Sequence, residues 1–186
     1  MCSSDLGAGV LVTTEQCLLH KNRNPHLARE EIASQVCAAL GQDRIVWLPH
    51  GLFLDDGTDG HVDNVAAFAS TEVIVMQGCD DKNEPDHARM AANHRVAADA
   101  GLQVREIPVL PFAEVDGRRV VVPYGNFYVV NGGVIVPVCG HAADDDVLAL
   151  LGEWFPGRQV VGLDVGEILA YGGGGIHCIT QQVPAV

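Results

Sequence analysis

The 186-residue sequence has few basic residues, few aromatic residues and no long apolar segment. Lys and Arg number 11 against 24 Asp and Glu, which gives a formal net charge of −13. Because such a surface repels phosphate, we expect no nucleic-acid partner. The apolar runs are short, as in Val120–Val122, whereas a membrane helix needs roughly 18 consecutive apolar residues. The sequence therefore predicts no membrane-embedded segment.

Cysteine spacing excludes two further classes of protein. The six cysteines are irregularly spaced and form no CxxC pair. We therefore expect neither a disulfide scaffold nor a zinc ribbon. Reduced thiols are typical of the cytoplasm, which is the compartment that we predict. The length, together with the lack of any linker-like segment, predicts a single domain.

The first six residues differ in character from the rest of the chain. Met1–Leu6 has no targeting pattern and resembles the translated tail of a sequencing adapter, so we interpret residues 1–6 as a non-native scar. Residues 7–186 are then expected to be the C-terminal part of a single domain whose N-terminal portion is missing.

One unit recurs along the chain, in the order strand, strand, helix, strand. Apolar residues at helical spacing predict three helices, near residues 26–40, 85–100 and from 144 onward. Strands are expected at 10–14, 44–48, 62–69, 72–76, 103–109, 127–130, 134–138, 159–163 and 176–181. Asn131-Gly132-Gly133 predicts a hairpin between two of these strands. About three units fit an arc of a larger ring, although an ordinary open α/β sheet would also fit.

A run of four glycines, Gly172–Gly175, stands just before Cys178. Glycine runs are costly in regular structure, so this one indicates a close backbone approach or positive φ angles. Cys178 is then a candidate nucleophile beside exposed backbone N–H groups. A glycine-rich turn with Cys178 in the core is the alternative. A phosphate loop fits less well, because no Lys or helix-forming segment follows.

A second candidate site lies between Asp55 and Asn64. On a strand, His61 and Asp63 would point to the same side. The imidazole could then move protons while the carboxylate holds a cationic substrate. His50, His61 and Asp63 also suit a metal site by ligand type, but they lack a familiar metal-binding spacing. Asn126, at a strand entrance, is a weaker candidate, because turn-forming Asn is common there.

Four segments together resemble the family of agmatine deiminases and bacterial-type peptidyl-arginine deiminases. They are Asn22–Leu27, Gly57–Asn64, Gly125–Phe127 and Gly173–Pro184. The resemblance extends from about Gly7 to the C-terminus. This family has the pentein fold, a five-module α/β propeller. The resemblance therefore implies an incomplete ring of about three strand-strand-helix-strand units.

The resemblance also implies roles for individual residues. Cys178 corresponds to the nucleophile that attacks a guanidinium carbon, His61 to the general acid and base, and Asp63 to a carboxylate that binds guanidinium nitrogens. Asn126, Gly174 and Gly175 are implied to contact the substrate.

The implied reaction is hydrolysis of agmatine to N-carbamoylputrescine and ammonia in polyamine synthesis. It proceeds through a covalent thiouronium intermediate and needs no metal or organic cofactor. Peptidyl or free arginine is the alternative substrate. The family's second guanidinium-binding carboxylate lies in the missing portion, so we expect this chain alone to be inactive.

Two other classes of function stay open on sequence grounds. A non-catalytic pentein-like binding module would share the fold, although the joint presence of Cys178, His61 and Asp63 argues against it. A metal-dependent hydrolase would use the second candidate site. The sequence is compatible with a homo-oligomer and does not specify its size.

Overall fold

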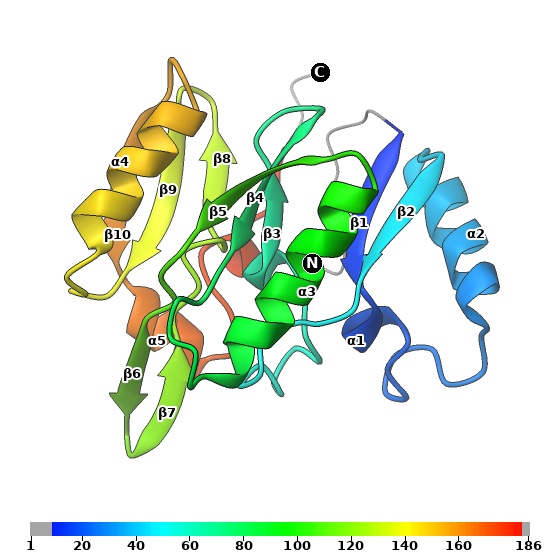
Figure 1. Ribbon diagram of the computed structural model, residues 1–186, viewed down its shortest axis with the longest axis horizontal. Helices are drawn as coiled ribbons and strands as arrows, with labels where there is room; N and C mark the ends of the chain where they lie inside the picture. The colour runs from blue at the N-terminus through cyan, green and yellow to red at the C-terminus, as the bar shows by residue number, and fades with distance from the viewer. Residues whose placement is uncertain (1–8, 184–186) are drawn as a thin grey trace.

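The computed structural model describes residues 9–183, so the interpretation of residues 1–6 as a scar falls outside the described residues. Three small α/β units stand side by side, each with a helix against a sheet (Figure 1). The first unit pairs β1 (Val10–Thr14) in parallel with β2 (Arg44–Leu48). Between them come the short α1 (Glu15–Leu18) and α2 (Arg29–Leu40), which packs on β2.

The start of α2 differs from the prediction. The helix begins at Arg29 rather than near residue 26, and the N–H of Ala28 donates to the Glu31 carboxylate at 2.8 Å. Asn24 does not cap it, because its side-chain amide donates to the Leu18 carbonyl at 2.9 Å and holds the preceding turn. The predicted end is confirmed, since Gly41 takes the left-handed conformation with φ 65°.

The middle and last units have the predicted order of strand, strand, helix, strand. In the middle unit, β3 (Ala66–Phe68) is antiparallel to β4 (Val73–Gln77), α3 (Pro85–Asp99) follows, and β5 (Gln103–Ile107) is parallel to β4. The last unit repeats this with β8 (Tyr128–Val130), β9 (Gly133–Val138), α4 (Asp144–Trp154) and β10 (Gln159–Asp164). The predicted hairpin between β8 and β9 is confirmed.

Two elements lie outside the predicted repeat. The hairpin of β6 (Phe112–Val115) and β7 (Arg118–Val121) turns at Asp116 and Gly117, both with positive φ. Asp-Gly is a strong signal for such a turn, although this hairpin was not among those predicted. The helix α5 (Gly166–Tyr171) packs against this hairpin and leads into the glycine run.

Two predicted strands are wrong. Residues 62–64 form a 3₁₀ turn, η1 (Val62–Asn64), before β3 begins, so the prediction of one strand over 62–69 fails in its first half. Residues 177–179 form a second 3₁₀ turn, η2 (His177–Ile179), in place of a strand at 176–181. The His177 N–H donates to the backbone carbonyl and to the side-chain oxygen of Asn126 rather than to a neighbouring strand.

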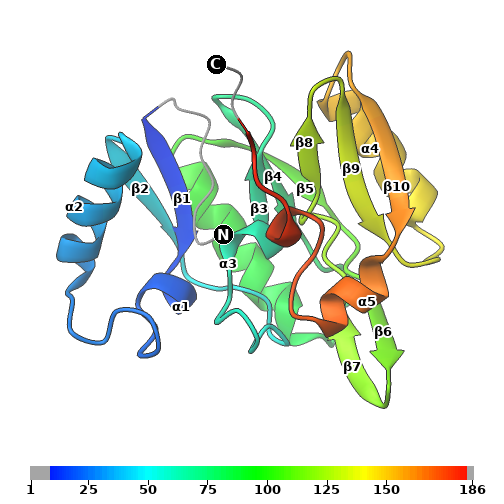
Figure 2. The same cartoon turned by 180° about the vertical axis from the view of Figure 1, so that it is seen from behind.

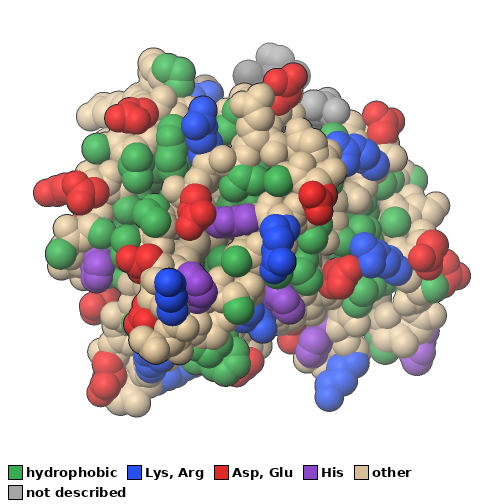
Figure 3. Space-filling model, in the orientation of Figure 1, with side chains coloured by type: hydrophobic (Ala, Val, Ile, Leu, Met, Phe, Trp, Pro, Cys, Tyr) green, Lys and Arg blue, Asp and Glu red, His purple; other side chains and the backbone are tan. Residues whose placement is uncertain are grey.

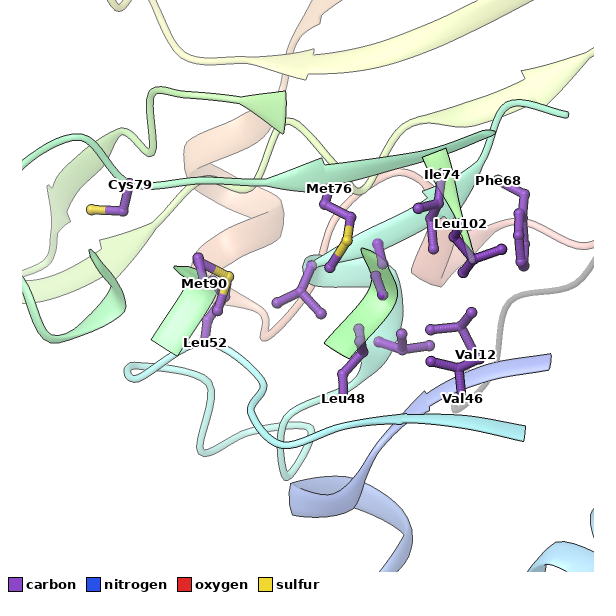
Figure 4. Packing of buried hydrophobic residues seen from close by; sticks show 14 of the residues in the cluster. Val12, Val46, Leu48, Leu52, Phe68, Ile74, Met76, Cys79, Met90 and Leu102 are labelled. Carbon is purple, nitrogen blue, oxygen red and sulfur yellow. The ribbon is translucent and has the colours of Figure 1, made fainter. Parts of the chain in front are cut away.

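The units are joined because the middle sheet packs on both of its faces. On β4, Ile74 and Met76 face the first unit and α3, whereas Val75 faces the last unit, as the alternation of a strand requires. Figure 4 shows the first of these cores, with Val12 and Val46 opposite Ile74. The second core contains Phe127 from the segment before β8 and Leu151 from α4. Shared cores make each unit a support for the next.

Acidic and basic side chains are interspersed over the face shown in Figure 3. Within residues 9–183, no helix is long and apolar enough to cross a membrane.

Candidate active site

The candidate site is a cavity of about 330 Å³ on the side of the molecule seen in Figure 2, where η2 lies between the first and last units. His61 and Cys178 both line it. The other lining residues come from the loop before η1, from α5 and from the segment that includes the glycine run: Thr58, Ile168, Leu169, Gly172, Gly173, Gly174, Gly175 and Ile179. The fold therefore brings together two segments that lie more than a hundred residues apart in the sequence.

Asp63 lies next to both His61 and Cys178. Its Oδ1 is 3.9 Å from His61 Nδ1, and its Oδ2 accepts a hydrogen bond from Cys178 Sγ at 3.2 Å. His61 and Asp63 thus come together as predicted, but through the 3₁₀ turn rather than on one face of a strand. The predicted chemical trio is adjacent in space.

His177 is a fourth member of this cluster, and no role was predicted for it from the sequence. Its Nδ1 lies 2.9 Å from Asp63 Oδ2, the oxygen that also receives the Cys178 thiol. A strand over 176–181 would have pointed His177 away from Cys178, and this is why it was missed. In the tighter η2 turn both side chains reach Asp63.

The electrostatics of the cluster keep Asp63 charged and Cys178 protonated. Burial by itself would raise the pKa of Asp63, but hydrogen bonds from His177 and Cys178 hold it below its usual value. The pKa of the Cys178 thiol is raised, first by burial and then by the Asp63 charge, against the opposing effect of hydrogen bonds from Gly175 and Asn126. A cation in the cavity would offset the Asp63 charge and favour the thiolate.

Asn126 is completely buried beneath Cys178 and does not line the cavity. Its Nδ2 donates to Cys178 Sγ at 3.2 Å, and its Oδ1 accepts from the His177 N–H at 2.9 Å and from the Cys178 N–H at 3.4 Å. The structure therefore places it against the nucleophile rather than at the substrate surface.

The glycine run permits this close packing. A Cβ built on Gly174 would lie 2.6 Å from Cys178 Sγ, and one on Gly175 would lie 2.5 Å from Asn126 Oδ1. Real Cβ atoms do not come so close, so any other residue would displace the nucleophile or its amide partner. Both glycines line the cavity, as expected of residues that contact a substrate.

The segment with Asn22 and Arg23 packs on the loop before η1. Arg23 donates to Asp59 Oδ2 at 3.1 Å, and its Nη2 lies 3.1 Å from His61 Nε2. A guanidinium only donates, so Nε2 accepts and the ring proton of His61 lies on Nδ1, facing Asp63. Arg23 belongs to a motif that carried the resemblance, but no role was predicted for it.

His50 takes no part in this cluster. Its backbone N–H and carbonyl bond the side chain of Asn93 on α3. Among the residues that the structure describes, no three His, Cys, Asp or Glu side chains are grouped so as to hold a metal ion.

The sequence model of one protein family, the Porphyromonas-type peptidyl-arginine deiminases, matches residues 3–184 of the chain. An agmatine deiminase of Stutzerimonas stutzeri is 42% identical over 96% of this chain and 55% of its own length. One from Medicago truncatula is 35% identical over 97% of the chain and 55% of its own length. The chain therefore spans about half the length of the curated relatives that it matches.

A solved structure gives the same result for the fold. C. jejuni agmatine deiminase with substrate bound superposes with a TM-score of 0.89 and 27% identity, over 95% of this chain and 53% of that one. The predicted pentein α/β fold is confirmed over the part of the relative that the chain covers.

Proposed function

The chain belongs to the Porphyromonas-type peptidyl-arginine deiminase family, and from that premise we propose that it carries the nucleophile and proton-transfer residues of an agmatine deiminase. The reaction is hydrolysis of the agmatine guanidinium to N-carbamoylputrescine and ammonia, a step in putrescine and polyamine biosynthesis. Curated agmatine deiminases at 42% and 35% identity support this substrate over peptidyl or free arginine.

The observation that carries the proposal is the contact of Cys178 Sγ with Asp63 Oδ2 at 3.2 Å, beside a cavity that His61 also lines. A thiol that must ionise next to a carboxylate needs a compensating positive charge. A bound guanidinium supplies that charge and also contains the carbon to be attacked. The nucleophile is therefore activated only when substrate is bound.

The mechanism has two steps. In the first, the Cys178 thiol proton passes to His61, Sγ forms a bond with the guanidinium carbon, and one C–N bond breaks as His61 gives that proton to the amino group that leaves as ammonia. In the second, water adds to the thiouronium carbon while His61 accepts a proton. The C–S bond then breaks as the carbonyl forms, and the remaining hydroxyl proton returns to the sulfur. His61 passes its proton to solvent, so the carbamoyl product leaves and the Cys178 thiol is regenerated.

The remaining residues assist binding. Asp63 accepts hydrogen bonds from guanidinium N–H groups, which fixes the planar cation for attack. Gly174 and Gly175 allow the substrate to approach the backbone. Asn126 does not contact the substrate and donates a hydrogen bond to Cys178 Sγ. Ile168, Leu169 and Ile179 form an apolar part of the cavity wall, suited to the methylene chain of agmatine.

The wider setting is also part of the proposal. Residues 7–186 are the C-terminal part of one catalytic domain, and residues 1–6 are not native to it. The complete domain closes a ring of five units, of which this chain supplies about three. We further place the protein in the cytoplasm, where its five free cysteines among the described residues stay reduced. A homo-oligomer is compatible with this assignment.

The test is ammonia release by this chain joined to the sequence encoded upstream of it in its gene, hereafter the extended protein. Agmatine, arginine and an arginyl peptide are compared, with Cys178→Ala as the inactive variant and Cys139→Ala as its matched control. Both cysteines are partly exposed, but only Cys178 lines the cavity.

Turnover of agmatine that survives Cys139→Ala and is lost in Cys178→Ala is the expected result. Preference for arginine or for the peptide would keep the mechanism and replace the substrate. Absence of Cys178-dependent turnover with all three compounds would contradict the deiminase function and favour a non-catalytic binding module.

A further inference from the structure

We propose that Asp55 and Asn64 are positioning residues that hold the nucleophile and the proton-transfer residue in register, through Asn126 and Thr58, without contacting the substrate. The proposal rests on the function proposed above and concerns residues outside the resemblance-based set of site residues. Asp55 is the common point of two chains of hydrogen bonds, one leading to Cys178 and one to His61.

The first chain leads to the sulfur. Asp55 Oδ2 accepts from Asn64 Nδ2 at 2.9 Å, and Asn64 Oδ1 accepts from Asn126 Nδ2 at 2.8 Å. The same Asn126 Nδ2 donates to Cys178 Sγ at 3.2 Å. One hydrogen of the Asn126 amide is thus held by Asn64, which leaves the other aimed at the nucleophile.

The second chain leads to the imidazole. The Thr58 hydroxyl donates its single hydrogen to Asp55 Oδ2, and the Thr58 N–H donates to Oδ1 at 3.2 Å. The hydroxyl oxygen then accepts from the His61 N–H at 3.1 Å. Asp55 therefore fixes the backbone at the position from which the His61 side chain extends into the cavity.

The direction of both chains is set by the carboxylate, which only accepts when ionised. Reversal of the Asn64 amide would oppose its N–H groups to those of Asn126 and its oxygen to Asp55. Asp55, Asn64 and Asn126 are 6%, 3% and 0% exposed, so water cannot replace a lost partner at little cost. A buried acceptor at one end thus determines which amide atom faces the sulfur at the other.

Other uses of Asp55 fit the geometry less well. A solvated acidic loop, the ordinary interpretation of Asp55 and Asp56 from the sequence, applies to the exposed Asp56 and not to the buried Asp55. Asp55 does not line the cavity that contains His61 and Cys178, so it is not a substrate ligand there.

The experiment compares Asp55→Asn, Asn64→Asp and the double exchange of both in the extended protein, with Asp56→Asn as the matched control. In the double exchange, the amide introduced at position 55 donates to the carboxylate introduced at position 64, and that carboxylate still accepts from Asn126. Measured quantities are kcat and KM for agmatine, the rate of Cys178 alkylation by iodoacetamide at several pH values, and urea unfolding.

We expect each single exchange to lower kcat by about ten- to a hundredfold with little change in KM, because small misplacement of reacting groups costs about this much. Each should also change the pH dependence of Cys178 alkylation, since the hydrogen bond to sulfur is disturbed. The double exchange should recover most of the kcat and the parental alkylation profile. Asp56→Asn should match the parent throughout.

Parental kcat and parental alkylation in both single variants would overturn the proposal while leaving the deiminase function intact. Failure of the double exchange to recover a folded single variant's loss would also overturn it, because a loss from general damage is not reversed by restoring one hydrogen-bond direction. If the parent does not turn over agmatine, the proposed function fails. The alkylation profiles still decide whether the chain of hydrogen bonds from Asp55 acts on Cys178. Should a single variant not fold, Thr58→Val takes its place, because it removes the hydroxyl that links Asp55 to the His61 N–H. The double exchange is still compared with the parent.

Discussion

The turns that precede β3 and β8 share one backbone hydrogen bond and differ in their side chains. In each, an Asn N–H donates to the carbonyl three residues earlier, from Asn64 to His61 at 3.4 Å and from Asn126 to Pro123 at 3.1 Å. Each Asn is buried two residues before the first strand of its unit. The two side chains then meet directly, with 2.8 Å between Asn126 Nδ2 and Asn64 Oδ1.

The difference lies in the neighbours of the two asparagines. His61 and Asp63 occupy the positions at which the later turn has Pro123 and Gly125. The earlier turn therefore carries the ionisable groups. The later one is neutral, and its Gly125 N–H donates to the buried Gln77 at 3.3 Å. A repeated scaffold thus supplies matching positions, while the residues that fill them divide the work between chemistry and support.

The largest expected effect on kcat comes from substituting the first residue of the earlier turn, His61, and little effect is expected from substituting its counterpart in the later turn, Pro123. His61→Gln in the extended protein should lower kcat by about 10² to 10⁴, because proton transfer to ammonia and from water is lost. Pro123→Ala, the equivalent change in the supporting turn, should leave kcat nearly unchanged and alter only stability. Steady-state ammonia release and urea unfolding of both variants measure the difference. Equal losses of kcat would mean that the division of work between the turns is wrong.

Removal of the Asp63 charge should separate turnover from thiol reactivity. The Asp63 carboxylate raises the pKa of Cys178, so Asp63→Asn should lower that pKa and increase the thiolate fraction at pH 7.5. Alkylation of Cys178 should then be faster than in the parent, in which burial and the Asp63 charge hold the pKa of the thiol above its usual value. Turnover should fall, because the guanidinium loses its carboxylate.

The two readouts of Asp63→Asn are an iodoacetamide time course followed by mass spectrometry and steady-state ammonia release. Asp56→Asn is the control, as an exposed carboxylate in the neighbouring loop. Slower alkylation of Cys178 in Asp63→Asn would contradict the electrostatic account of the site.

A methyl group between the nucleophile and the later turn tests their contact. Gly175→Ala places a Cβ 2.5 Å from Asn126 Oδ1, which should destabilise the fold by about 1–3 kcal/mol and lower kcat. Gly152→Ala in α4 meets nothing within 4 Å and should stabilise by about 0.5–1 kcal/mol. Urea unfolding and turnover check both, and an unchanged kcat in Gly175→Ala would show that Asn126 need not lie so close.

The smallest effect is expected at the mouth of the cavity. Ile179 is 70% exposed, so Ile179→Ser should change stability by less than about 0.5 kcal/mol. It should raise KM for agmatine by a few-fold through loss of apolar contact with the methylene chain, and leave kcat unchanged. A lower kcat would place Ile179 among the residues that align the reacting groups.

The sequence was most informative where its pattern repeats. Short apolar runs located β1 and β2, and helical periodicity located α3, almost to the residue, because local side-chain patterning and burial agree there. The motif resemblance selected Cys178, His61 and Asp63, which lie together in the structure. The assignment of residues 1–6 and the roles of these site residues stay predictions.

The errors fall where backbone groups bond side chains instead of other strands. Residues 62–64 and 176–181 have apolar content typical of strands, but their N–H groups are directed to turn carbonyls and to Asn126. Such partners are distant in sequence, so no local pattern contains them. His177 was missed for this reason, and so were Asn64 and Thr58.

Spacing along the chain was enough to establish the order of the units, most of the helices and strands that form them, and the types of residue available for chemistry. Those properties can be examined without knowing the fold. The contacts of Asp63 with Cys178 and His177, the place of Asn126 beneath the sulfur, and the link that buried Asp55 makes between the two reactive segments became visible only in the folded chain. Hydrogen bonds and charge effects depend on distances of a few ångströms, and the packing of the units sets those distances.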